Sequence, residues 1–156
     1  MTQNSILIVD DDKDVGAFLK DLLSSWGFQA SYAEDGVSAM FELHRKKADL
    51  LILDYEMPGG NGMEIYERLR ANSKFNDLPI LFISAHSFSQ IDPKIRQIAH
   101  IRFLNKPIDP EKLRKNIQEL LHLTEQPKID TKPPNKSFEP DAQPRTIIDL
   151  DSESKD

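Results

Sequence analysis

The feature that most constrains the fold is a run of four aliphatic residues that ends on a carboxylate. The run is Leu50–Leu53, the carboxylate is Asp54, and residues 58–62 (Pro-Gly-Gly-Asn-Gly) follow shortly after. A short, unbroken aliphatic run bounded by turn-forming residues is typical of a strand that is buried on both faces of a parallel sheet. Asp54 is then expected at the carboxyl end of that strand, the edge where open α/β sheets bind ligands.

Four other segments have strand-like composition, and helical periodicity separates them. The further strands are predicted over 6–9, 28–33, 79–84 and 101–104. One helix face is predicted from the spacing of Val15, Phe18, Leu19, Leu22, Leu23 and Trp26. Further helices are expected over about 37–47, with Val37, Met40, Phe41 and His44 on one side, and over 62–71, 92–99 and from Pro110 onward. Alternating strands and helices predict an α/β fold, a doubly wound five-stranded parallel sheet with helices on both faces.

Composition places the folded part in residues 1–124 and excludes several classes of protein. Five of the ten prolines lie in 125–156, where apolar residues are sparse, so this part is predicted to be a disordered, acidic, proline-rich tail. The net charge of -6 argues against non-specific nucleic-acid binding, and no apolar run is long enough to span a membrane. The absence of cysteine fits a reducing compartment, so a cytoplasmic location is expected.

Polar residues stand at the ends of four predicted strands. Asp10 and Asp11 follow the first strand, Asp54 ends the third, Ser84 ends the fourth and Lys106 follows the fifth. In a doubly wound sheet these ends converge on one crevice. Three carboxylates in one crevice repel each other unless a cation neutralises them, and a hard ion such as Mg2+ prefers such oxygen ligands. The sequence therefore predicts a Mg2+ site at this edge.

The chain resembles the receiver domains of two-component response regulators, including single-domain chemotaxis regulators. The resemblance rests on the segments 8–12, 53–59 and 83–85 and on Lys106-Pro107, with thirty residues from Asp54 to Ser84 and fifty-two from Asp54 to Lys106. It covers 5–124 and implies a flavodoxin-like sheet of strand order 2-1-3-4-5. It also implies a cis peptide bond before Pro107.

The resemblance assigns a role to each site residue. It implies that Asp54 is the phosphoacceptor, that Asp10, Asp11, Asp54 and Glu56 (through its carbonyl) hold Mg2+, and that Lys106 pairs with phosphoryl oxygens. Ser84 would supply a hydroxyl, the Ala85 N–H a further donor, and Phe103 would be the switch aromatic. Glu56 and His86 lie at positions that influence hydrolysis of the phosphoryl group. The residues before Phe103 depart from the family's usual Gly-Ala turn.

The resulting expectation is a receiver that takes a phosphoryl group from a histidine kinase or a phosphotransfer protein and signals by a conformational switch. It is not expected to be an enzyme, apart from accepting its own phosphoryl group and slowly losing it. It is expected to be a monomer or weak dimer that binds an unknown output protein. Neither nucleic acid nor a membrane is expected as a partner. Two alternatives stay open: a phosphorylation-independent interaction module on the same fold, and a Mg2+-dependent phosphohydrolase that forms an aspartyl phosphate. A short apolar segment among acids, 146–153, is either solvated or a docking motif.

Overall fold

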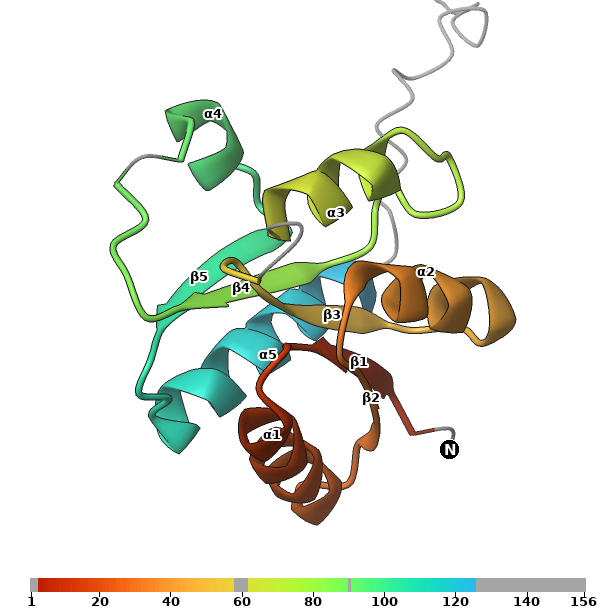
Figure 1. Ribbon diagram of the computed structural model, residues 1–156, viewed down its shortest axis with the longest axis vertical. Coiled ribbons are helices and arrows are strands. Elements are labelled where there is room, and N and C mark those ends of the chain that lie inside the picture. The colour runs from red at the N-terminus through yellow and green to blue at the C-terminus, as the bar shows by residue number, and fades with distance from the viewer. Residues whose placement is uncertain (1–2, 58–61, 90, 126–156) are drawn as a thin grey trace, which may run out of the picture. The chain divides into compact units, whose positions relative to one another are not determined.

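The fold is a five-stranded parallel sheet between two layers of helices (Figure 1). A computed structural model describes residues 3–57, 62–89 and 91–125. The strands lie in the order β2-β1-β3-β4-β5, as predicted. Their bounds are β1 Ser5–Val9, β2 Gln29–Ala33, β3 Leu50–Asp54, β4 Ile80–Ser84 and β5 Ile101–Asn105. Residues 58–61 and all of the predicted tail except its first residue, Glu125, lie outside the described residues.

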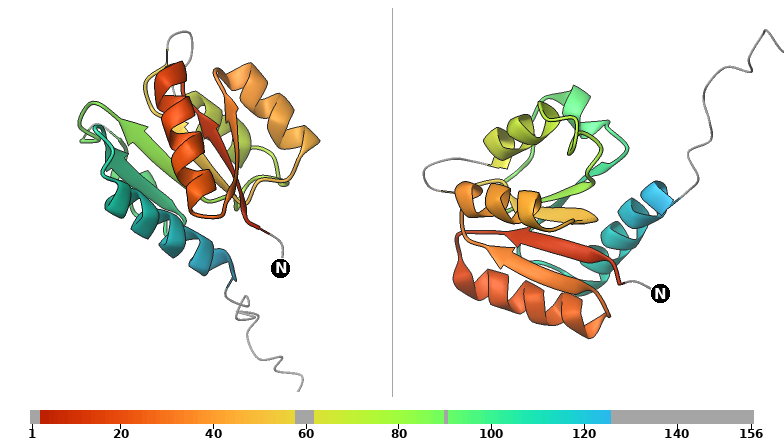
Figure 2. Two further views of the ribbon diagram at one scale, coloured as in Figure 1. Left: turned by 90° about the horizontal axis from the view of Figure 1, so that it is seen from below. Right: turned by 90° about the vertical axis from the view of Figure 1, so that its right-hand side faces the viewer.

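The helices divide between the two faces of the sheet. They are α1 Lys13–Ser25, α2 Gly36–Arg45, α3 Gly62–Arg70, α4 Pro93–Arg96 and α5 Pro110–Glu125. Figure 1 and both views of Figure 2 show α1 and α5 on one face and α2, α3 and α4 on the other. Within the described residues, none of these helices combines the length and the apolar character that a membrane crossing requires.

Successive residues of each strand point to opposite faces of the sheet, and a separate hydrophobic core forms on each face. In β3, Leu51 and Leu53 face the α2–α3 layer, whereas Leu50 and Ile52 face the α1–α5 layer. All five residues of β3 and of β4 are buried, as expected of central strands covered on both sides. The continuous aliphatic run at 50–53 thus supplies both cores at once.

Local signals set the helix ends. Asp12 caps α1 by accepting from the backbone N–H groups of Asp14 and Val15, and Asp35 caps α2 by accepting from that of Ser38. After α1 the chain turns at Gly27, whose φ of +92° is a conformation that favours glycine. Asp109 accepts from the Glu111 N–H at the start of α5.

The predicted apolar side of α2 was wrong in part, because Met40 packs against the core but Val37 and Phe41 do not. Val37 and Phe41 are 77% and 61% exposed, and the helix instead buries Ala39 and Leu43. Residues two positions apart lie about 200° apart around a helix, so the stripe through Ala39 and Leu43 turns Val37 and Phe41 to the solvent. Phe18 on α1 is also exposed, although it was expected on the apolar face.

The helix predicted over 92–99 was too long, because α4 covers only Pro93–Arg96. Asp92 caps it, but after Arg96 the bonding pattern changes, and the Ile98 N–H bonds to Ile95 three residues back. None of the residues of α4 is buried, so little packing is present to extend the helix beyond one turn.

One arginine fixes the loop between α3 and β4. Arg70 ends α3, and its guanidinium donates to the carbonyls of Phe75 (2.8 Å) and Leu78 (3.0 Å). The same group lies over the Tyr66 ring, 4.9 Å from its centroid. This side chain therefore ties the loop that leads into β4 to the end of α3, in addition to the hydrogen bonds within the loop itself.

The start of α3 approaches the end of β3 so closely that only glycine fits. A Cβ at Gly62 would lie 2.6 Å from the Asp54 carbonyl oxygen, a backbone atom that cannot move aside alone. We expect Gly62→Ala to lower the free energy of unfolding by about 1–3 kcal/mol, the range for overpacking. Urea unfolding measures this. Gly36→Ala is the control, because its Cβ would meet only the flexible Ile65 side chain at 3.3 Å, and a similar loss in both variants would contradict the steric explanation.

Candidate functional site

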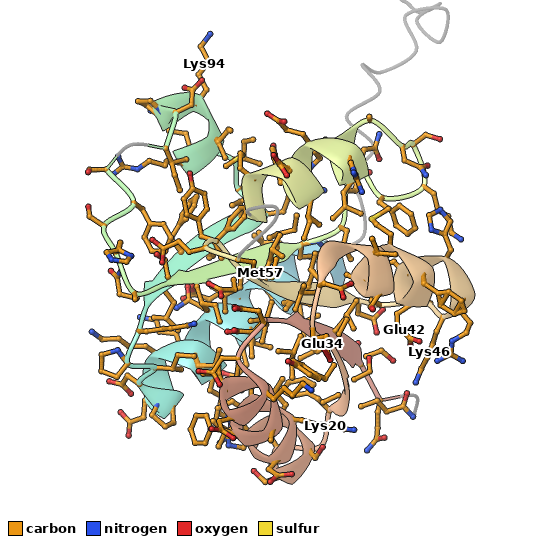
Figure 3. The ribbon with its side chains drawn as sticks, in the orientation of Figure 1. Lys20, Glu34, Glu42, Lys46, Met57 and Lys94 are labelled. Carbon is orange, nitrogen blue, oxygen red and sulfur yellow. The ribbon has the colours of Figure 1, made fainter. Side chains whose placement is uncertain are left out.

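The structure brings four of the predicted site residues to one edge of the sheet. Asp54 and Ser84 are the last residues of β3 and β4, while Asp10 and Lys106 directly follow β1 and β5. The pairing of Val9 with Leu53, Asp54 with Ile83 and Ser84 with Asn105 sets these ends side by side. In Figure 3 the labelled Met57, three residues beyond Asp54, marks this end of β3.

An ammonium group lies between two buried carboxylates at this edge. Lys106 Nζ is 3.1 Å from Asp10 Oδ2 and 3.7 Å from Asp54 Oδ2. Asp10 is 0% and Asp54 3% exposed, whereas Asp11 is exposed. Carboxylate oxygens of Asp10, Asp11 and Asp54 all lie within 4.8 Å of one another. The three acids and the lysine therefore form one charged cluster, as predicted from their strand-end positions.

Backbone groups fix the two buried carboxylates. The Asp12 N–H donates to Asp10 Oδ1 (2.9 Å), and the Glu56 N–H donates to Asp54 Oδ1 (3.2 Å). The backbone of Lys106 is tied to β4, because its N–H donates to the Ser84 carbonyl (2.8 Å). The Lys106-Pro107 peptide bond is cis, as the resemblance implied. Backbone hydrogen bonds thus fix the two buried carboxylates and the main chain of Lys106 in position.

The electrostatics favour a bound cation. The pKa of Asp54 is raised to about 7. Burial is the largest cause and the charge of Asp10 adds to the rise, whereas the Glu56 N–H and the Lys106 ammonium act to lower this pKa. Burial acts to lower the pKa of Lys106, but its hydrogen bond and charge attraction to Asp10 outweigh burial and raise it. A single ammonium therefore does not fully neutralise the carboxylates that surround it.

The donor set fits a hard divalent ion. The three acids offer oxygen atoms only, from one exposed and two buried side chains, and such a mixture of carboxylates and solvent suits Mg2+. The Glu56 carbonyl was expected to be a further Mg2+ ligand. Glu56 lies two residues after Asp54, and its N–H donates to the Asp54 carboxylate, but the role of its carbonyl stays a prediction.

Ser84 and Phe103 occupy different surroundings. Ser84 is fully buried, and its hydroxyl oxygen accepts the His86 N–H at 3.0 Å. Phe103 is partly buried in a row of aromatic rings: it stacks on Phe82 at 5.4 Å and contacts Phe88 at 5.0 Å between ring centroids. The structure therefore places Phe103 on the α2–α3 face of β5 and not at the acids, and its switching role stays a prediction.

Two contacts of the β4–α4 loop were not expected. His86 is 77% exposed at its side chain, yet its Nδ1 lies 2.5 Å from Glu56 Oε2, which joins this loop to the one after β3. The Asn105 amide donates to the carbonyls of Ser84 (3.3 Å) and His86 (2.9 Å). Glu56 and His86 were each expected at positions that influence hydrolysis, but their contact with each other was not predicted. An asparagine at 105 likewise carries no signal of its contacts.

A model of the response regulator receiver domain matches residues 6–118. The chain belongs to this family. It is similar to the chemotaxis protein CheY of Pseudomonas aeruginosa, with 30% identity over 74% of this chain and 94% of that protein. It also matches 7% of the hybrid signal transduction histidine kinase D of Dictyostelium discoideum, at 30% identity over 74% of this chain. The chain spans about half the length of the curated transcriptional regulators that it matches.

Solved structures of receivers have the same fold. The response regulator TrrA of Thermotoga maritima, solved in complex with Mg2+ and BeF, matches with a TM-score of 0.66 and 28% identity, over 76% of this chain and 99% of that chain. Membership in the family agrees with the fold and with the acidic cluster predicted from sequence.

The raised pKa of Asp54 has a measurable consequence for the metal-free receiver. An aspartate with a raised pKa in the folded state stabilises the fold at low pH, and this contribution is lost as pH rises from the ordinary value of 3.8 to about 7. We expect Asp54→Asn to raise the free energy of unfolding increasingly over this window, by up to about 4 kcal/mol above pH 7.

Urea unfolding at a series of pH values without metal measures this gain. Saturating Mg2+ is the control, because a cation beside Asp54 stabilises its ionised form and should shrink the advantage of the asparagine. A gain that is the same at pH 4 and at pH 8 would contradict the raised pKa.

Proposed function

We propose that this receiver accepts a phosphoryl group on Asp54 from a phosphohistidine of a histidine kinase or phosphotransfer protein. The supporting observation is the buried Asp54 carboxylate with Lys106 Nζ at 3.7 Å and two further acids within 4.8 Å. Phosphoryl transfer depends mainly on alignment and on neutralising charge at the phosphoryl oxygens. This cluster offers a nucleophile, a fixed cation and oxygen ligands for a second cation.

The side chains of the cluster support the transfer in the following way. An oxygen of Asp54 attacks phosphorus while the bond from phosphorus to the donor nitrogen breaks, and the leaving imidazole takes up a proton. The Glu56 N–H holds the other Asp54 oxygen at 3.2 Å, which orients the carboxylate. The Lys106 ammonium pairs with the phosphoryl oxygens, and Mg2+ held by Asp10, Asp11 and Asp54 would neutralise the remaining charge.

The surroundings of Asp54 support a receiver over a phosphohydrolase. Such an enzyme needs an acid near the acceptor to deliver protons in each turnover. Glu56 has the spacing for this role, but its partly exposed carboxylate is paired with the exposed His86 side chain. We therefore propose a single covalent event that is slowly reversed and no turnover of small phosphate esters. A cytoplasmic location and a monomeric or weakly dimeric state stay predictions.

Intact mass after incubation with acetyl phosphate and Mg2+ tests the acceptor. We expect the parent to gain the mass of one phosphoryl group, because acetate leaves as Asp54 attacks, and Asp54→Asn to gain none. Asp14→Asn, which removes an exposed acid on α1, is the matched control and should gain one group. Modification of Asp54→Asn, or repeated hydrolysis of acetyl phosphate at constant protein mass, would overturn the proposal.

We further propose that phosphorylation is transmitted through Ser84 to Phe103. A phosphoryl group attracts the Ser84 hydroxyl, which breaks its hydrogen bond from the His86 N–H and moves the loop that carries Phe88 against Phe103. Ser84→Ala should still accept the phosphoryl group at Asp54, but the NMR signals of the Phe103 ring should shift less on phosphorylation than in the parent. Equal shifts in both proteins would show that Ser84 does not carry the signal.

A further inference from the structure

A tyrosine on β2 contacts the main chain of the acidic cluster. The Tyr32 hydroxyl donates a 2.5 Å hydrogen bond to the backbone carbonyl of Asp10, twenty-two residues earlier in the chain. Tyr32 is partly buried, and in the sheet it pairs with Ile8, two residues before Asp10. Its side chain therefore runs along the carboxyl end of β1 toward the acids.

The bonded carbonyl belongs to the peptide unit that joins Asp10 to Asp11. The orientation of this peptide unit sets the directions in which both side chains leave the backbone. The Asp10 N–H donates to the Ala33 carbonyl at 3.2 Å, Oδ1 accepts from the Asp12 N–H, and Oδ2 accepts from Lys106. With the Tyr32 hydroxyl on its carbonyl, every polar atom of this fully buried residue has a partner.

The opposite side of the Tyr32 ring is shaped by α1. Gly16 is buried, and a Cβ there would lie 2.2 Å from Cε1 and 2.5 Å from Cδ1 of the tyrosine ring. The absence of a side chain at Gly16 therefore provides the space that the tyrosine ring occupies beside α1. Because the hydroxyl is hydrogen-bonded at the far end of the ring, the ring cannot shift away without losing the contact to Asp10.

We propose that Tyr32, seated on Gly16, is a positioning residue that orients the Asp10–Asp11 peptide unit so that both carboxylates can hold the divalent cation. Tyr32 itself touches neither the cation nor the phosphoryl group. The inference rests on the proposed function, in which these acids bind Mg2+. Groups that hydrogen-bond to metal-binding side chains or their backbone commonly change metal affinity by about tenfold or more when removed.

The first experiment removes only the hydroxyl. Calorimetric titration with Mg2+ should give a dissociation constant about tenfold higher for Tyr32→Phe than for the parent. Tyr66→Phe is the matched control, because Tyr66 is a buried tyrosine on α3 beside Arg70, away from the acids. The control should bind Mg2+ like the parent. Equal Mg2+ affinity in Tyr32→Phe and the parent would overturn the inference.

The second experiment tests the coupling to α1. Gly16→Ala should weaken Mg2+ binding in the parent, because the new methyl group displaces the tyrosine ring. In Tyr32→Ala the same substitution should have no effect on the Mg2+ dissociation constant, since no ring remains to displace. An equal effect of Gly16→Ala in both backgrounds would overturn the role of Gly16 as the seat of the ring.

Hydrogen exchange in the metal-free protein separates this inference from the proposed function. The Asp12 amide, which bonds to Asp10 Oδ1, should exchange at least several-fold faster in Tyr32→Phe than in the parent and in Tyr66→Phe. If the Asp12 amide exchanges faster in Tyr32→Phe than in the parent but the parent binds no Mg2+, the proposed function fails while the positioning contact stands. If the parent binds Mg2+ and the exchange rates are equal, the positioning contact fails alone.

Discussion

The close approach of the Lys106 ammonium to two buried carboxylates is the interaction on which the site depends. Its Nζ lies 3.1 Å from Asp10 and 3.7 Å from Asp54, and the three groups come from the ends of three different strands. Breaking a buried charge pair on one side typically costs about 3–5 kcal/mol, because the remaining charge stays desolvated. The electrostatics of the site therefore depend on the pairing of the strands. The registers of β1, β3, β4 and β5 set the distances between the three charged groups.

The positions of the acids, of Ser84 and of Lys106 could be predicted because topology alone brings strand ends together. Central strands reveal themselves as unbroken aliphatic runs, so β3 and β4 were found nearly to the residue, and parallel pairing then placed their last residues at one edge. This inference needs no knowledge of side-chain conformation. It therefore holds for residues whose place is set by the backbone of a buried strand.

The rest could not be predicted where packing outweighs pattern. Phe41 is as apolar as a core residue. It nevertheless faces the solvent, because α2 starts at Gly36 and buries Leu43 on its opposite side. A one-turn α4 could not be distinguished from a longer helix, because helical spacing does not report how much surface is buried. Contacts such as that of Asn105 with His86 depend on loop geometry, which local sequence does not specify.

The hold of Arg70 on the α3–β4 loop acts at the end of β4 opposite to the acidic cluster. Its two bonds, to Phe75 and Leu78, anchor the entry of β4, and the backbone N–H of Ile80 bonds to His100 beside it. The exit of β4 is secured by hydrogen bonds of the Ser84–His86 segment that involve side chains. The two ends of β4 are thus held by separate sets of contacts, so a rearrangement of the Ser84–His86 segment leaves the contacts of Arg70 in place.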